Sequence, residues 1–356
     1  MTPYLLLLLF VVIVAYIGRR SGSKGVRRIS ISAVFVALVA FAGLRDYRVG
    51  TDTGNYVRMW TFSDSFASVT EQSATEVGYN FLAWLARSIS DSYSVLLLLI
   101  AAIVVGCYVP TIVKLTRRYE TALFLFITLG VYTFVFNGAR QGIAAAICFA
   151  AIPFLLERRM IPYLLTVGIA TLFHRTAWIA LVLYPLASRR VDWRRPALLA
   201  AATVVLVVFL QVFVGLAVAL LDDKFAAYAV EGEGGGQVLV AFLLGQGVML
   251  YMFKDKVHDP AGHYGRLLNI YLIGLVPALA STVSGVDPSG LLRLHLYFSS
   301  VAILLWPMVF LQFRSTELRG LVAFAFICLT LLFFLLTIST FSGLVPYLLN
   351  SEIAGW

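Results

Sequence analysis

The sequence predicts an all-α polytopic membrane protein. Hydrophobic residues make up 61% of the 356 residues, and the mean hydropathy is +0.91. A soluble domain of this length could not bury so much apolar surface and keep a polar exterior. The apolar residues also fall into many runs of similar length, separated by short clusters of Lys and Arg. We therefore expect one polytopic domain over residues 1–356.

The predicted spans are the apolar runs that approach the length of a membrane-spanning helix, about 20 residues. They are residues 3–17, 29–44, 93–113, 121–136, 140–156, 196–221, 237–253, 267–283, 292–312 and 320–341. The first run has no cleavage site of small residues and continues directly into Arg19 and Arg20, which indicates a retained span rather than a signal peptide.

The distribution of charge predicts the orientation, because short loops rich in Lys and Arg stay in the cytoplasm. The clusters are Arg19/Arg20/Lys24/Arg27/Arg28, Lys114/Arg117/Arg118, Arg158/Arg159, Arg189/Arg190/Arg194/Arg195, Lys254/Lys256/Arg266 and Arg314/Arg319. With these inside, both termini and the segments 45–92, 137–139, 222–236 and 284–291 are external. The net charge of +9 reflects these loops, and we expect no nucleic acid as a partner.

The apolar run 160–187 lies between two clusters that are both predicted to be cytoplasmic. A single crossing would put those clusters on opposite sides, so we expect a short hairpin, with two arms of about 14 residues. Its turn falls at His174 and Arg175, since a charge in hydrocarbon costs a few kcal/mol or more. The hairpin brings the total to about twelve membrane helices.

Arginines are the unusual feature of the predicted external side, where Lys and Arg are normally scarce. The cations that map there are Arg45, Arg48, Arg58, Arg87, Arg140, Arg175, Lys224 and Arg293. Arginine stays charged and binds phosphate through two parallel hydrogen bonds, so a group at one depth could bind a lipid-linked phosphate or pyrophosphate. The alternative for each arginine is an ion pair with a loop carboxylate such as Asp46 or Asp64, or contact with lipid headgroups. That alternative is favoured for Arg48, Arg58 and Arg87.

The external loop 45–92 is the richest part of the sequence. Apolar residues at 79, 81, 82, 85 and 89 predict an amphipathic interfacial helix over about 76–90. The loop's aromatic residues could form an interfacial belt or stack on sugar rings. No nucleotide-binding or zinc-protease motif is present, the three cysteines lie in apolar runs, and the sequence predicts neither a metal site nor a cofactor.

Five motifs in order resemble the EpsG family, the Wzy-like polymerases of bacterial exopolysaccharides. They are "RDYRVGTDTGNYVRMW" at 45–60, Glu76 in "TEVGYNFLAWLA", "NGARQGIAAAI" at 137–147, "FHRTAWI" at 173–179 and "RLHLYF" at 293–298. One departure is Thr176, where the family often has serine; the hydroxyl is kept.

The resemblance implies a glycosyltransferase of the bacterial inner membrane with a GT-C-like architecture, whose site faces the periplasm. It would polymerise repeat units by moving the growing glycan from undecaprenyl diphosphate onto another lipid-linked repeat unit. Donor and acceptor oligosaccharides, membrane lipids and a chain-length regulator are the implied partners.

The residues that match the motifs are the candidates for the site. The catalytic candidates are Asp52, Glu76, Arg140 and His174, and the substrate-binding candidates are Arg45, Tyr56, Gln141, Arg175, Arg293 and Tyr297. Arg140, Arg293 and Arg45 would stabilise the leaving pyrophosphate. Asp52 or Glu76 would be the base, and His174 could act in either role.

Three other functions remain open from the sequence. An O-antigen ligase uses a similar donor and needs similar charges. A membrane O-acyltransferase also depends on a membrane histidine, but its acyl donor would come from the cytoplasm. A flippase or channel would need ionisable residues through a central cavity, and few lie inside the predicted spans.

Overall fold

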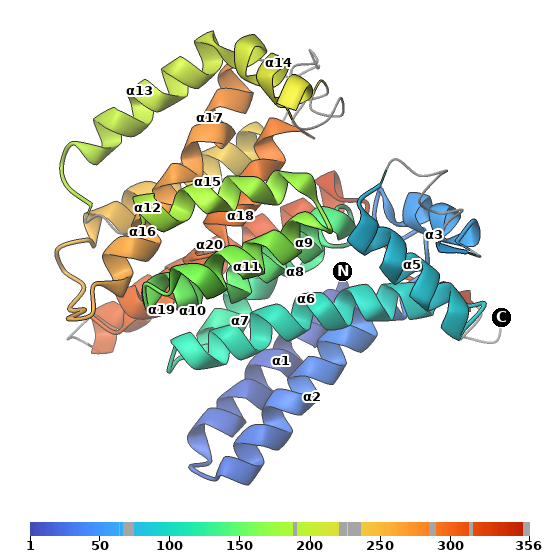
Figure 1. Ribbon diagram of the computed structural model, residues 1–356. Coiled ribbons are helices and arrows are strands. Elements are labelled where there is room, and N and C mark those ends of the chain that lie inside the picture. The colour runs from blue at the N-terminus through green and yellow to red at the C-terminus, as the bar shows by residue number, and fades with distance from the viewer. Residues whose placement is uncertain are drawn as a thin grey trace. The chain divides into compact units, whose positions relative to one another are not determined.

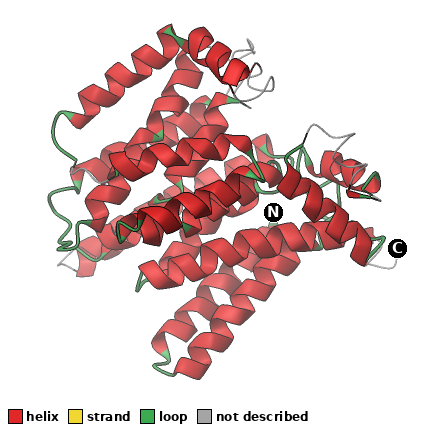
Figure 2. Ribbon diagram, in the orientation of Figure 1, coloured by secondary structure: helices red, strands yellow, loops and turns green. Residues whose placement is uncertain are grey.

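The computed structural model describes residues 1–63, 65–66, 75–187, 191–220, 226, 236–284, 290–312 and 316–351. These residues are helices joined by loops (Figure 2), as the sequence predicts. Some predicted features lie outside them: Arg189 and Arg190 of one cytoplasmic cluster, Lys224, Asp64 and most of the Gly-rich segment at 232–236.

Within the described residues, 6 helices are long and apolar enough to cross a membrane, or up to 8 if each bent pair is one span. The 6 are Thr2–Arg20, Lys24–Gly43, Ser94–Leu115, Ala139–Leu156, His263–Ser284 and Gly320–Phe341. The chain is therefore a polytopic membrane protein by length and composition, but the predicted count of about twelve is not confirmed.

The count of spanning helices falls short of twelve because several of the helices are too short. The predicted segments are helical, but several form shorter apolar helices: Tyr119–Thr128, Met160–Thr171, Arg175–Leu186 and Gln237–Met252. The first of them ends because Gly130 follows with a φ of 76°, a left-handed conformation that interrupts an α-helix and suits glycine.

Two compact units divide the chain, and each is described by itself. The first unit comprises Met1–Leu181 and Phe313–Trp356. Its elements are α1 (Thr2–Arg20), α2 (Lys24–Gly43), α3 (Thr53–Thr61), α5 (Val77–Ile89), α6 (Ser94–Leu115), α7 (Tyr119–Thr128), α8 (Val131–Phe134), α9 (Ala139–Ala150), α10 (Ile152–Leu156), α11 (Met160–Thr171), most of the 3₁₀-helix η1 (Arg175–Val182), α20 (Thr316–Leu336) and the π-helix η4 (Thr337–Phe341).

Long helices pack in sequence to form the first unit. Helices α1 and α2 form an antiparallel pair (Figure 1), α2 packs on α6, α6 on α9 and α9 on α11. Tyr108 of α6 lies between Phe126 and Phe149, with ring centroids 4.7 and 4.6 Å away. These aromatic contacts hold the end of α9, where Phe149 lies, against α6 and α7.

The segment after η4 packs against the end of α2 and the loop that follows it. The backbone N–H of Asp46 donates to Leu348 O at 2.9 Å, and that of Asn350 donates to Leu44 O at 2.9 Å. Gly50 N–H donates to Gly343 O at 2.9 Å. Backbone bonds therefore fix the loop that leads from α2 to Asp52 and α3.

The run 160–187 reverses direction where the sequence predicts the turn. Helix α11 ends at Thr171 and η1 begins at Arg175, so the chain turns at 172–174. The two arms touch, since the hydroxyl of Tyr163 donates to Ala180 O at 2.5 Å. The hairpin therefore presents His174 at its tip.

The second unit is Val182–Gln312. Its elements are the end of η1, α12 (Leu183–Leu186), α13 (Arg195–Val208), α14 (Leu210–Leu220), α15 (Gln237–Met252), α16 (His263–Ile273), α17 (Leu275–Ser284), the 3₁₀-helix η3 (Leu291–His295), α18 (Leu296–Ser299) and α19 (Ala302–Phe310). Helices α13 and α14 meet at a 72° bend, visible in Figure 1. Trp306 Nε1 of α19 donates to Gln246 Oε1 of α15 at 3.0 Å, which satisfies two buried polar groups between apolar helices.

Candidate functional site

A carboxylate from the loop before α5 lies at the centre of the site. Glu76 immediately precedes α5, and the first turn of that helix lies against the turn of the 160–187 hairpin. Gly78 N–H donates to Leu172 O at 2.8 Å, and a Cβ on Gly78 would come within 2.7 Å of that oxygen. Glycine is needed here because the two backbones approach too closely for a side chain.

An arginine at the start of α9 binds that carboxylate. Arg140 Nη1 donates to Glu76 Oε2 at 2.7 Å. A residue far away in the sequence positions the first turn of α9. Ala139 N–H donates to the hydroxyl of Tyr56 in α3 at 3.1 Å. Gly138, which precedes α9, provides no side-chain cap, so Tyr56 satisfies one of the N–H groups that a helix start leaves unpaired.

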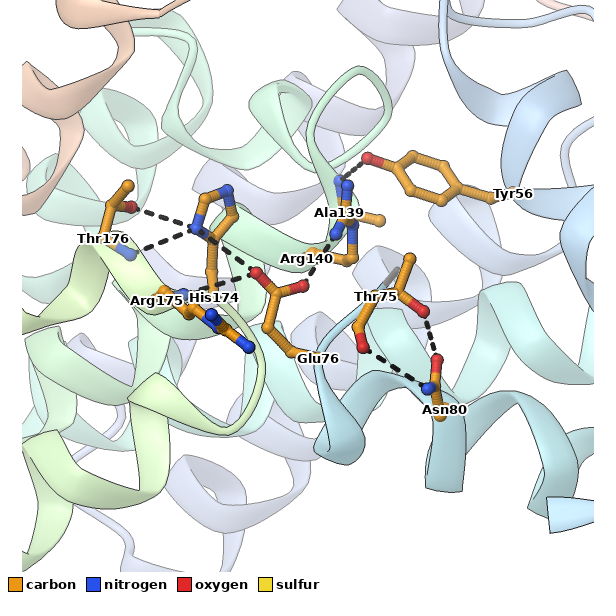
Figure 3. A network of polar contacts seen from close by, with 9 residues as sticks. All are labelled: Tyr56, Thr75, Glu76, Asn80, Ala139, Arg140, His174, Arg175 and Thr176. Carbon is orange, nitrogen blue, oxygen red and sulfur yellow. Dashed lines mark hydrogen bonds and ion pairs between the residues drawn. The ribbon is translucent and has the colours of Figure 1, made fainter. Parts of the chain in front are cut away.

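The tip of the hairpin binds the other carboxylate oxygen (Figure 3). Arg175 N–H donates to Glu76 Oε1 at 3.4 Å, and His174 Nδ1 lies 4.0 Å from the same oxygen. Glu76 thus joins the starts of α5 and α9 to the hairpin.

A neighbouring residue fixes the imidazole ring of His174. Thr176 N–H donates to His174 Nδ1 at 3.3 Å, and Thr176 Oγ1 lies 3.1 Å from the same nitrogen. A backbone N–H can only donate, so Nδ1 accepts and the neutral ring carries its proton on Nε2. Figure 3 shows Nε2 turned away from Glu76, which makes it a hydrogen-bond donor directed elsewhere.

The charges of the site favour an anion. Burial by itself would raise the pKa of Glu76, but Arg140 and His174 outweigh it and hold that pKa below its ordinary value. The carboxylate is therefore ionised and a weak base. The Glu76 carboxylate contacts one guanidinium group, one backbone N–H and a histidine ring, and the Arg140 and His174 side chains remain 27% and 22% exposed.

Two buried donors of the site have no hydrogen-bond partner among the described residues. They are Arg140 Nε and the Tyr79 hydroxyl, and the Tyr79 ring lies 5.7 Å from that of Tyr56. A buried donor without a partner costs about 1–3 kcal/mol. An anion that reached this edge of the Arg140 guanidinium would recover part of that cost.

Arg45 takes a different position from the one expected of a phosphate ligand. Its side chain is 2% exposed, and its guanidinium donates to Ala42 O and to Thr53 Oγ1 and lies 4.1 Å from the centre of the Phe136 ring. Burial lowers the pKa of Arg45 to about 10. In this conformation Arg45 supports the start of α3, one residue from the half-buried Asp52.

The remaining predicted residues are not all brought together. Gln141 is buried in α9, next to Arg140. Arg293 in η3 and the buried Tyr297 in α18 belong to the second unit, and their roles stay predictions. Arg48 pairs with Asp46 at 2.7 Å, and Arg87 pairs with Asp91 at 3.0 Å, in keeping with the structural alternative for these arginines.

The sequence reasoning missed Thr176, Tyr79 and Gly78 as parts of the site. A threonine two residues after a histidine, as Thr176 is after His174, does not by itself indicate a site. Tyr79 occupies one apolar position of the predicted amphipathic helix and was assigned to its apolar face. Gly78 directly follows Val77 at the start of α5, and such a glycine within a helical pattern could have pointed to a close backbone approach.

Comparison with known protein families gives a match over most of the chain. The model of the EpsG family matches residues 28–349, which include every segment of this site. No curated protein and no solved structure matches the chain.

Proposed function

Since the chain belongs to the EpsG family, we propose that it polymerises the repeat units of a bacterial polysaccharide. It would transfer the growing glycan from undecaprenyl diphosphate to a hydroxyl of another lipid-linked repeat unit, at the periplasmic face of the inner membrane. The family suggests an exopolysaccharide or O-antigen polymerase in general terms; donor, acceptor and membrane face are our proposal.

The observation that carries the proposal is the cluster of Arg140, His174 and Glu76 at the ends of apolar helices. Helix ends lie near the depth of lipid headgroups, where the diphosphate of a polyprenyl carrier must also lie. Within the described residues, the cluster offers a guanidinium whose Nε has no hydrogen-bond partner, and an imidazole that is held through its Nδ1 by Thr176. Both suit a diphosphate.

The reaction assigns a step to each group. The acceptor oxygen attacks the anomeric carbon while the bond from that carbon to the diphosphate oxygen breaks, and the diphosphate leaves with the electron pair. Arg140 and His174 Nε2 would stabilise the charge that develops on this leaving group. The proton of the acceptor hydroxyl must pass to a base.

Asp52 is the better candidate for that base. Both carboxylate oxygens of Glu76 already accept hydrogen bonds, from Arg140 and from the Arg175 N–H, and its cationic neighbours lower its pKa, which makes it a weaker base. Asp52 precedes α3 by one residue and Tyr56 follows one turn later. Because Tyr56 reaches the residue beside Arg140, the start of α3 is held next to the cluster. Glu76 would then orient Arg140 and the hairpin.

A strain that lacks this chain tests the proposed function against its rivals through its lipid-linked products. Loss of a polymerase should leave single repeat units on the carrier at the periplasmic face. Loss of a ligase would leave long polymer on the carrier. Loss of a flippase would leave single units at the cytoplasmic face, and loss of an acyltransferase would leave polymer without its acyl groups. Any of these three patterns would overturn the proposal.

A further inference from the structure

A second cluster of cations lines a pocket at the other end of the first unit. The pocket has a volume of about 460 Å³ and lies where α1 ends, α2 begins and α6 runs into α7. Arg19, Arg27, Lys114 and Arg117 contribute to its wall. The loop that leads to the site around Glu76 leaves the opposite end of α2. That helix has 20 residues and is therefore about 30 Å long. The pocket is thus separate from that site.

The pocket has more cations than nearby carboxylates can neutralise. Glu120 pairs with Arg19 at 2.8 Å and lies 3.8 Å from Arg118, and Glu157 pairs with Lys114 at 3.4 Å. In the described part of the chain, no carboxylate lies within 4 Å of Arg27 or Arg117. Both guanidinium groups are therefore available for an anion from outside the protein.

A buried hydroxyl in the same wall has no hydrogen-bond partner in the part of the chain that the structure describes. It belongs to Tyr119, which lines the pocket and is 2% exposed. The guanidinium of Arg27 lies 5.7 Å from the centre of its ring. Buried polar groups are normally paired, so an unpaired hydroxyl in the wall that also contains Arg27 and Arg117 favours a ligand with acceptor oxygens.

We propose that this pocket binds a phosphate group, as presented by the headgroup of an anionic phospholipid. The surrounding helices α1, α2 and α6 are long and apolar enough to cross a membrane, so their ends lie at the depth of lipid headgroups. Basic pockets between such helices are a recognised setting for anionic headgroups, and the volume is within the range of small-ligand sites. The inference is independent of the polymerase proposal.

Titration of the purified chain with phosphatidylglycerol in detergent, followed by native mass spectrometry, tests this site. Phosphatidylcholine serves as the neutral lipid. The double variant Arg27→Gln/Arg117→Gln removes both uncompensated cations. Arg28→Gln is the matched control, because Arg28 is the exposed neighbour of Arg27 in α2 and does not line the pocket.

We expect the parent and Arg28→Gln to bind phosphatidylglycerol in preference to phosphatidylcholine, and the double variant to bind it about ten-fold or more weakly. Equal binding by the double variant and the control, or no preference in the parent, overturns the proposal. Inorganic phosphate, added as a competitor, identifies the source. Displacement of the lipid means that the phosphate alone is recognised, and no displacement means that the lipid headgroup is required; either supports a phosphate site.

If the double variant does not fold, the variant Tyr119→Phe tests the same proposal. It removes only the unpaired hydroxyl, so the lipid-free protein should melt at the same temperature as the parent or higher, while phosphatidylglycerol binds several-fold more weakly. A lower melting temperature with unchanged lipid binding would make the hydroxyl structural and would contradict the proposal.

Discussion

Arg140 and Glu76 lie 64 residues apart in the chain and form an ion pair of 2.7 Å between the starts of α9 and α5. The other oxygen of Glu76 accepts the backbone N–H of Arg175, 99 residues further along than Glu76. The Glu76 carboxylate therefore orients both Arg140 and the tip of the hairpin. Substitutions of the surrounding residues can distinguish a role in orienting these groups from a role in the reaction.

Glu76→Gln should destabilise the protein by about 1–3 kcal/mol at neutral pH, because Arg140 loses its charged acceptor in a largely buried position. The pKa of Glu76 is lowered in the folded protein, so the ion pair stabilises fully above the ordinary value of 4.5 and is lost as the pH falls through the folded value. The melting temperatures of parent and variant should therefore converge as the pH falls below 4.5.

Glu157→Gln is the matched control for that experiment. Its carboxylate pairs with Lys114 and Arg159 at 3.4 Å but is 45% exposed, and exposed pairs contribute little to stability. A Glu76→Gln variant that melts like this control at every pH would mean that the Arg140 pair does not hold the site together.

The ring of His174 is expected to act as a donor through Nε2. His174→Gln, which keeps one donor but cannot titrate, should retain partial activity that is insensitive to pH, and His174→Ala should retain less. Almost no activity in the Gln variant would instead indicate a proton shuttle. Parent rates in both variants, with the protein folded, would remove His174 from the mechanism.

The hydroxyl of Thr176 is expected to hold that ring in its orientation. Thr176→Ser keeps the hydroxyl 3.1 Å from Nδ1 and should behave as the parent. Thr176→Val leaves only the backbone N–H, so the turnover rate should fall about ten-fold, with the pH profile shifted. Equal rates and profiles in the two variants would contradict this positioning role.

Tyr56→Phe removes the acceptor of Ala139 N–H at the start of α9. Loss of a helix-start partner costs about 0.5–2 kcal/mol, and the same change should lower activity because Arg140 is the next residue. Thermal melting and the polymerisation rate measure the two effects. Tyr47→Phe, at a 47% exposed tyrosine in the turn before α3, is the control, and a Tyr56 variant equal to it in both measurements would contradict the prediction.

Membrane orientation can be tested at two described positions. In a background with Cys328→Ala, Ser88→Cys on the exposed side of α5 should react with an impermeant thiol reagent in intact cells. Ser21→Cys, exposed between α1 and α2, should react only after the membrane is disrupted. The reverse pattern would invert the positive-inside assignment and place the Glu76 cluster in the cytoplasm.

The helices could largely be predicted from the sequence because long apolar runs have few alternatives in a membrane. Their lengths could not. Gly130 ends α7 early, and Phe209 lies at the 72° bend between α13 and α14. Both breaks depend on local backbone conformation and packing, which hydropathy does not report.

The candidate site could be predicted as a set of residues but not as a set of contacts. The position of His174 at a hairpin tip follows from the charges that flank the run 160–187. The pairing of Glu76 with Arg140 depends on tertiary packing across 64 residues. Arg45 was expected beside the phosphate, but it is buried next to a loop whose backbone bonds to the last described segment, as Asp46 does to Leu348. No pattern in the sequence predicts that this C-terminal segment packs against the loop after α2.

The polymerase proposal is tested most directly by the purified chain in vesicles supplied with lipid-linked single repeat units. The parent should convert them into a ladder of longer lipid-linked glycans. Arg140→Lys, which keeps the charge but not the planar guanidinium, should leave nearly all of them as single units while remaining folded. A parent that leaves the repeat units unchanged, or an Arg140→Lys variant that makes the same ladder at the same rate, would contradict the account.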